Sequence, residues 1–78
     1  MRFIISKGYG EKFEELKVFE SSDLKATYQF LVANASKGRL SSYEALERDI
    51  EKESDLEPVY GFYLKDEGNE LFYMQVNK

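Results

Sequence analysis

The chain has 78 residues, and its 42% hydrophobic and 15% aromatic content is typical of one folded domain. It contains no Cys and no His, which excludes disulfide bonds and removes the usual ligands of a tight zinc site. Eleven Lys and Arg residues against 15 Asp and Glu residues give a net charge of −4, which argues against direct binding to nucleic acid or to anionic membranes. A chain this short has a small core, so we expect close packing or self-association to supply its stability.

No targeting or membrane-spanning segment is visible in the sequence. The N-terminal apolar run, Met1–Ser6, is too short for a signal peptide. No run approaches the roughly 20 apolar residues of a membrane span. We therefore expect a cytoplasmic protein.

The N-terminal part of the chain predicts a β-hairpin. Arg2–Lys7 is rich in β-branched and aromatic residues, and Gly8-Tyr9-Gly10 ends this first strand. A second strand is expected over Lys12–Glu20, where apolar residues fall on both faces.

Helical spacing begins after the second strand. Ser21-Ser22-Asp23 offers N-cap residues, while Lys37 and Gly38 fit a helix end. The first helix is therefore predicted from about Asp23 to Lys37. Its apolar stripe recurs at i, i+4, i+7 and i+11 and consists of Leu24, Tyr28, Leu31 and Ala35.

A second helix follows at once. Ser41 with Glu44 three residues later forms a capping-box pattern, and the helix is predicted to run to about Glu53. Pro58 marks the exit because it cannot continue a helix. The apolar face of this helix consists of Tyr43, Leu46 and Ile50.

The C-terminal part predicts a second β-hairpin. Its strands are Val59–Lys65 and Glu70–Val76, and its loop is Asp66–Asn69. The order of elements is therefore ββααββ. We expect an α+β fold with a four-stranded antiparallel sheet and two helices packed on one face.

Both faces of this C-terminal hairpin are apolar if Lys65 pairs with Glu70. One face then shows Tyr60, Phe62, Leu64, Leu71, Tyr73 and Gln75. The other face shows Val59, Gly61, Tyr63, Phe72, Met74 and Val76. Two short helices can cover only one face of a sheet, so we expect the other to pack against a partner or a second copy.

Residues suited to catalysis or cofactor binding are scarce. The absence of His and Cys removes the commonest general base and the best nucleophile. Gly8 and Gly10 are not followed by the Lys-Ser/Thr ending of a phosphate loop, and Asp66–Glu70 lacks the ligand spacing of a calcium loop. We therefore expect no catalytic residue, no metal and no cofactor.

The negative charge is concentrated between Glu44 and Glu57. This segment holds seven acidic residues against Arg48 and Lys52, a net charge of −5, which exceeds that of the whole chain. Arg48 can pair with Glu44 at i+4. An unpartnered row at i+4 spacing is predicted, made of Glu47, Glu51 and Asp55. The row is either a solvated helix face or a surface that meets a basic protein.

Together these features favour a small, non-enzymatic intracellular protein-binding module. Compact acidic chains of this kind act as inhibitors or adaptors in phages and mobile elements, which is an analogy only. The alternatives are an acidic nucleic-acid mimic that occupies the DNA- or RNA-binding site of a host protein, and a structural homodimer subunit. The candidate partner-binding residues are Glu44, Glu47, Glu51, Asp55, Glu57, Tyr60, Tyr63 and Tyr73.

Overall fold

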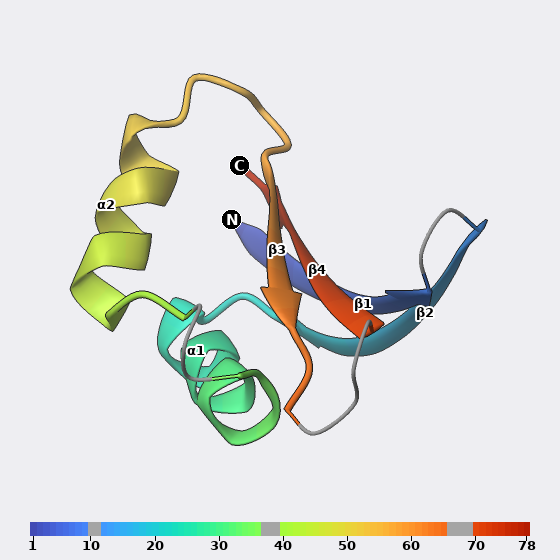
Figure 1. Cartoon of the computed structure of the whole chain (residues 1–78). Coiled ribbons are helices and arrows are strands. Elements are labelled where there is room, and N and C mark those ends of the chain that lie inside the picture. The colour runs from blue at the N-terminus through green and yellow to red at the C-terminus, as the bar shows by residue number, and fades with distance from the viewer. Residues whose placement is uncertain (10–11, 37–39, 66–69) are drawn as a thin grey trace.

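The computed structural model describes residues 1–9, 12–36, 40–65 and 70–78, and for residues 9, 12–15 and 70 it describes the backbone alone. The elements are β1 Arg2–Tyr9, β2 Lys12–Ser21, α1 Leu24–Asn34, α2 Tyr43–Lys52, β3 Val59–Tyr63 and β4 Glu70–Asn77. The strands form one antiparallel sheet in the order β2-β1-β4-β3 (Figure 1). This confirms the predicted α+β fold and its ββααββ order.

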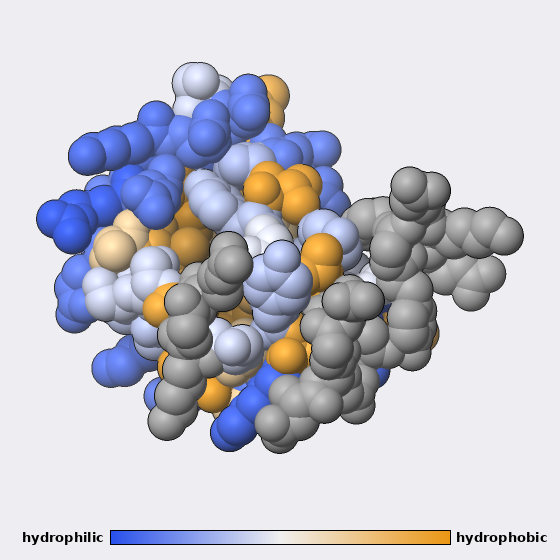
Figure 2. Space-filling view, viewed as in Figure 1, coloured by the Kyte–Doolittle hydropathy of each residue, from blue (hydrophilic) through white to orange (hydrophobic). Residues whose placement is uncertain are grey.

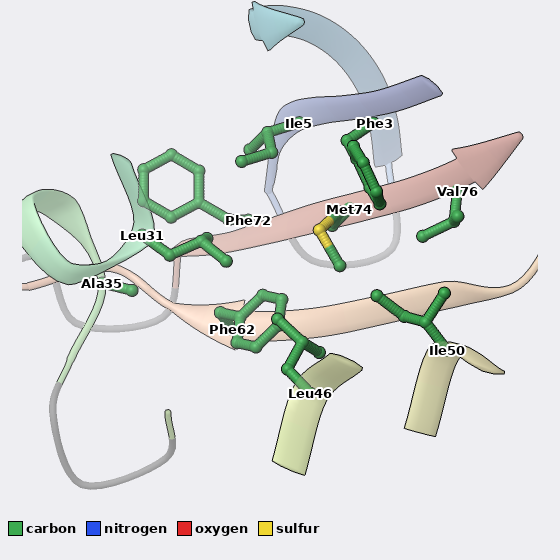
Figure 3. Close-up of a cluster of buried hydrophobic side chains, with 10 residues drawn as sticks. All are labelled: Phe3, Ile5, Leu31, Ala35, Leu46, Ile50, Phe62, Phe72, Met74 and Val76. Atoms are coloured by element: carbon green, nitrogen blue, oxygen red, sulfur yellow. The ribbon is translucent and has the colours of Figure 1, made fainter. Parts of the chain in front are cut away.

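Both helices lie on one face of the sheet, and the core fills the space between them and the strands (Figures 1 and 3). Alternate residues of a strand point to opposite faces, so β1, β3 and β4 give alternate side chains to this core. The buried hydrophobic residues are Phe3, Ile5, Leu31, Ala35, Leu46, Ile50, Phe62, Phe72, Met74 and Val76. Burying each large side chain of this kind contributes about 1.5–3 kcal/mol, and in a chain without Cys no disulfide adds to this stability.

Helix α1 begins where the sequence predicts and ends earlier. The Asp23 side chain caps it by accepting a hydrogen bond of 3.0 Å from the Lys25 N–H. The predicted extension to Lys37 is wrong, because Ala35 is already extended and forms a β-bridge with Leu64. The Ser36 N–H donates to the Tyr63 carbonyl at 2.7 Å, which fixes this bridge. The predicted helix-ending residue Gly38 lies outside the described residues.

Helix α2 begins one residue later than the capping box predicts. Ser42 is the N-cap, and its hydroxyl accepts a hydrogen bond of 3.2 Å from the Ala45 N–H, so the predicted pairing of Ser41 with Glu44 is wrong. The Ser41 carbonyl instead accepts a hydrogen bond of 2.7 Å from the Tyr28 hydroxyl. This bond holds the residue before the cap against α1.

The predicted register of the C-terminal hairpin is wrong by one residue. Tyr63 lies opposite Leu71, and Phe62 lies opposite Phe72. A one-residue slip moves every side chain of a strand to the other face, so the two predicted hairpin faces are exchanged along β4. The observed register places Phe62 of β3 and Phe72 and Met74 of β4 together under the helices. The predicted loop Asp66–Asn69 lies outside the described residues.

Candidate functional site

The candidate partner-binding residues lie on different sides of the sheet. In the observed register, Tyr63 and Tyr73 share the face opposite the helices, which we call the open face. Glu44, Glu47 and Glu51 belong to α2, on the other side of the sheet. The structure therefore does not bring the acidic helix and these two tyrosines onto one surface.

Among the described residues, one half of the open face consists of uncharged side chains, with the Glu57 carboxylate hydrogen-bonded to one of them, Gln75. This half is formed by β3 and β4, with Val59 59% exposed and Tyr63 41% exposed. The residues of this uncharged half are Val59, Gly61, Tyr63, Leu71, Tyr73 and Gln75. In Figure 2, hydrophobic residues reach the surface over β3, whereas hydrophilic residues gather over α2 and the segment after it.

Gly61 lies at the centre of this uncharged half and is itself exposed. A Cβ atom built there would meet the Tyr73 ring at 4.0 Å, which is ordinary van der Waals distance. A larger residue would therefore fit at this position. Glycine is also an unfavourable choice there, because it weakens a strand. A glycine that its own domain does not require is typical of a position that another backbone approaches closely.

The backbone of β3 is open along its first part. The Pro58 carbonyl accepts from the Val76 N–H and faces β4, whereas the Tyr63 carbonyl accepts from Ser36 and faces away. Backbone direction alternates along a strand, so the N–H and C=O groups of Val59 and Gly61 also face away from β4. Among the described residues no strand lies beside them.

The other half of the open face is charged. Glu20 on β2 accepts hydrogen bonds from the Lys17 ammonium at 2.8 Å and the Arg2 guanidinium at 2.5 Å. These two bonds, that of Lys17 first, lower the pKa of the Glu20 carboxyl to about 2. The charged group lies on the strands β1 and β2, away from β3.

Tyr60 does not belong to the open face. Its ring packs against the core, and its hydroxyl is buried with no hydrogen-bond partner among the described residues. Burial raises the pKa of Tyr60, and the nearby carboxylates of Glu53 and Asp49 raise it further. The structure therefore separates this residue from Tyr63 and Tyr73, with which it was grouped as a hairpin aromatic.

The predicted acidic row is shorter than the sequence pattern indicates. Helix α2 ends at Lys52, so Asp55 lies beyond it and does not continue the row of Glu47 and Glu51. Glu57 also lies outside the helix, where its carboxylate accepts a hydrogen bond of 3.4 Å from Gln75. The row that the helix does present runs at i, i+3 and i+7 and consists of Glu44, Glu47 and Glu51.

Glu44 of this row borders a groove between α1 and α2, which we call the helix groove. The groove has a volume of about 700 Å³. Its lining residues are Lys25, Tyr28, Gln29, Val32, Ala33, Tyr43 and Glu44. The Tyr28 and Tyr43 rings meet edge to face with centroids 5.6 Å apart, so two aromatic side chains form part of the floor.

A second hollow of about 250 Å³ continues along the same flank of α2. It is lined by Met1, Phe3, Ser22, Leu24, Glu47, Ile50 and Glu51. Because Glu44 lines the first hollow and Glu47 and Glu51 line the second, one flank of α2 carries carboxylates beside both.

The surroundings of Tyr43 show that this flank is electrostatically negative. Its hydroxyl donates a hydrogen bond of 3.4 Å to the Glu47 carboxylate. Desolvation raises the pKa of Tyr43, and the charges of Glu47, Asp23 and Glu44 raise it further. Arg48 forms no ion pair with Glu44 within the described part of the chain, so the predicted i+4 pair does not neutralise this flank.

In residues 1–9, 12–36, 40–65 and 70–78 no three acidic side chains lie close enough to hold a metal ion. Neither α1 nor α2 is long and apolar enough to cross a membrane.

Sequence reasoning assigned Tyr28 and Tyr43 only to the core and did not single out Val32. The hint available was that Val32, an apolar residue, lies off the predicted stripe of α1, and it is 43% exposed. Comparison of the chain with protein-family models, with curated proteins and with solved structures found no match.

Proposed function

We propose that this chain is a small, non-enzymatic, intracellular protein-binding module of the inhibitor or adaptor kind, and that it binds through the uncharged half of the open face. The observation that carries the proposal is the position of Gly61. It lies on an edge strand between exposed Val59 and Tyr63, where the domain itself has no need of a glycine. Tyrosines beside aliphatic residues are typical of protein interfaces.

The edge position supports a particular way of binding. A partner strand that adds to β3 would use the outward N–H and C=O groups of Val59 and Gly61 for affinity. Tyr63 and Tyr73 would then contact its side chains on the open face. Because Gly61 has no side chain, a partner backbone or a bulky partner residue can approach the sheet closely there.

A homodimer is the second candidate. The same edge favours it, because two antiparallel copies of β3 can pair about a two-fold axis. The nucleic-acid mimic has weaker support, since it depended on the spaced row of Glu47, Glu51 and Asp55, and Asp55 lies beyond α2.

The variant Gly61→Val tests the proposal because it separates stability from binding. A valine side chain has room beside Tyr73 and favours a strand, so the free energy of unfolding should rise by roughly 0.5–1 kcal/mol. The partner captured from an extract of the native host by the wild-type chain should be lost, and its measured affinity should fall at least about tenfold.

The matched control is Lys17→Ala, on the charged half of the open face, which should leave capture unchanged. Urea unfolding of each variant establishes that the fold is intact. If Gly61→Val is stable and still binds the captured partner as tightly as the wild type, the open face is not the binding surface. If the wild type self-associates, and Gly61→Val loses this self-association but still captures the partner, the homodimer is the correct alternative.

A further inference from the structure

The helix groove has an apolar floor that the fold leaves uncovered. Val32 is 43% exposed in it, and the rings of Tyr28 and Tyr43 line it from both helices. Such a surface gains free energy when another apolar surface removes it from water. The groove is lined by residues of α1 and α2. Both helices lie on one face of the sheet (Figure 1), so the groove is separate from the open face.

One flank of α2 is acidic beside the helix groove and the second hollow, and this charge selects among occupants. Glu44 lines the helix groove, and Glu47 and Glu51 line the second hollow on the same flank of α2. Among the described residues that line the two hollows, Lys25 has the one cationic side chain. A second copy that docked through its own α2 would bring a second acidic helix to the same place, and nucleic acid would bring phosphates. Both are repelled, whereas a basic segment is attracted.

The spacing of the carboxylates indicates the form of that segment. At i, i+3 and i+7 they extend over about 10 Å of α2, given the rise of 1.5 Å per residue. A helix lying alongside repeats its own residues with the same rise. Its basic residues can therefore meet the three carboxylates in step while its apolar stripe faces the floor.

We propose that the helix groove binds a basic amphipathic helix of a partner protein. The apolar stripe of this helix rests on Tyr28, Val32 and Tyr43. Its Lys or Arg residues meet Glu44, Glu47 and Glu51. Because the open face lies on the other side of the sheet, both surfaces can be occupied at once, which suits an adaptor that joins two proteins.

The test uses the full chain and a synthetic peptide of about 18 residues with Leu and Lys in amphipathic helical order, long enough to form helix on binding. Backbone amide shifts recorded during the titration should move at Val32 and Tyr43 and stay constant at Tyr63. Affinity should fall as salt rises from about 0.05 M to 0.3 M. A peptide with Glu in place of Lys should not bind, and a scrambled Leu/Lys peptide should bind at least about tenfold more weakly.

Two triple variants with the same change in charge decide the role of the row. The first triple variant should bind the Leu/Lys peptide at least about tenfold more weakly, mainly through a slower on-rate. It combines Glu44→Gln, Glu47→Gln and Glu51→Gln. The control, which is Asp49→Asn with Asp55→Asn and Glu57→Gln, should change affinity by less than about threefold.

Val32→Ser tests the floor separately, and it should weaken binding without changing the salt dependence. Any of three results would overturn the proposal. The two triple variants could bind the peptide equally well, the amide shifts could be confined to the open face, or the scrambled peptide could bind as tightly as the ordered one. If the first triple variant does not fold, the shift map and Val32→Ser decide the question. Gly61→Val should bind the peptide normally, so this result and the test of the open face can fail independently.

Discussion

The two edges of the sheet differ in their protection against other strands. The segment of β2 contains Lys12, Glu14, Glu15, Lys17 and Glu20, and its pairing with β1 shifts register twice. The segment of β3, VYGFY, has no charge, and its pairing with β4 is regular. Charges and bulges are the usual means by which proteins keep an edge from pairing. The edge strand β2 is thus protected against pairing with another strand, whereas the edge strand β3 is suited to pairing with a partner.

The first test concerns how much each edge strand contributes to the core. Phe62 on β3 is 6% exposed, whereas Leu16 on β2 is 65% exposed. Phe62→Ala should lower the free energy of unfolding by about 3–5 kcal/mol, because it leaves a cavity. Leu16→Ala should change it by less than about 0.5 kcal/mol. Urea unfolding of both variants provides the measurement, and equal losses would contradict the difference between the edges.

The second test gives β3 the kind of protection that β2 has. Val59→Lys places a charge on the exposed face of the open edge and should change the free energy of unfolding by less than about 1 kcal/mol. Self-association, if it occurs, should show as a species near twice 9.1 kDa in sedimentation equilibrium of the wild type and should be lost in the variant. A wild-type chain that stays monomeric at tens of micromolar would rule out the homodimer.

The third test concerns the buried hydroxyl of Tyr60 on β3. Tyr60→Phe removes a polar group that has no partner among the described residues, so the free energy of unfolding at neutral pH should rise by about 1 kcal/mol. The pKa of Tyr60 is raised in the fold above its ordinary 10.0. The part of the folding stability that depends on a neutral Tyr60 is therefore fully present below pH 10 and is lost as pH rises through the folded pKa. Alkaline unfolding curves should therefore be flatter in the variant. A lower stability at neutral pH would show that the hydroxyl has a partner.

The fourth and smallest test concerns the charged half of the open face. The pKa of Glu20 is lowered from 4.5 to about 2 by Lys17 and Arg2, so the stability from this carboxylate is present above pH 4.5 and is lost as pH falls toward 2. Glu20→Gln should flatten the acid limb of a plot of unfolding free energy against pH within this window. An unchanged acid limb would indicate that these exposed hydrogen bonds do not persist in solution.

Local patterns in the sequence were sufficient for the elements of the fold. The i, i+4 and i+7 spacing of Leu24, Tyr28 and Leu31 predicted α1, and runs of β-branched and aromatic residues predicted the strands. The hairpin register was not predictable in this way. Both faces of β3 and β4 are apolar in either register, so the choice depends on which face meets Phe3 and Ile5 of β1, which no local pattern contains.

The candidate surfaces were predictable only in part. The concentration of acids in α2 is visible in the sequence, but the end of the helix at Lys52, which removes Asp55 from the row, is not. The helix groove was missed because it needs Val32 of α1 and Tyr43 of α2 on facing sides of one hollow. That arrangement arises from the packing of two helices rather than from a motif in either.

The bridge between Ala35 and Leu64 has a consequence for the symmetry of any assembly. It occupies the far end of β3, so an added strand can pair only with the part around Val59 and Gly61. A filament built by strand addition needs two competent edges on every subunit, and here β2 is charged and irregular. Pairing of β3 with β3 uses the same edge in both copies and is then complete, so growth stops at a closed, two-fold pair.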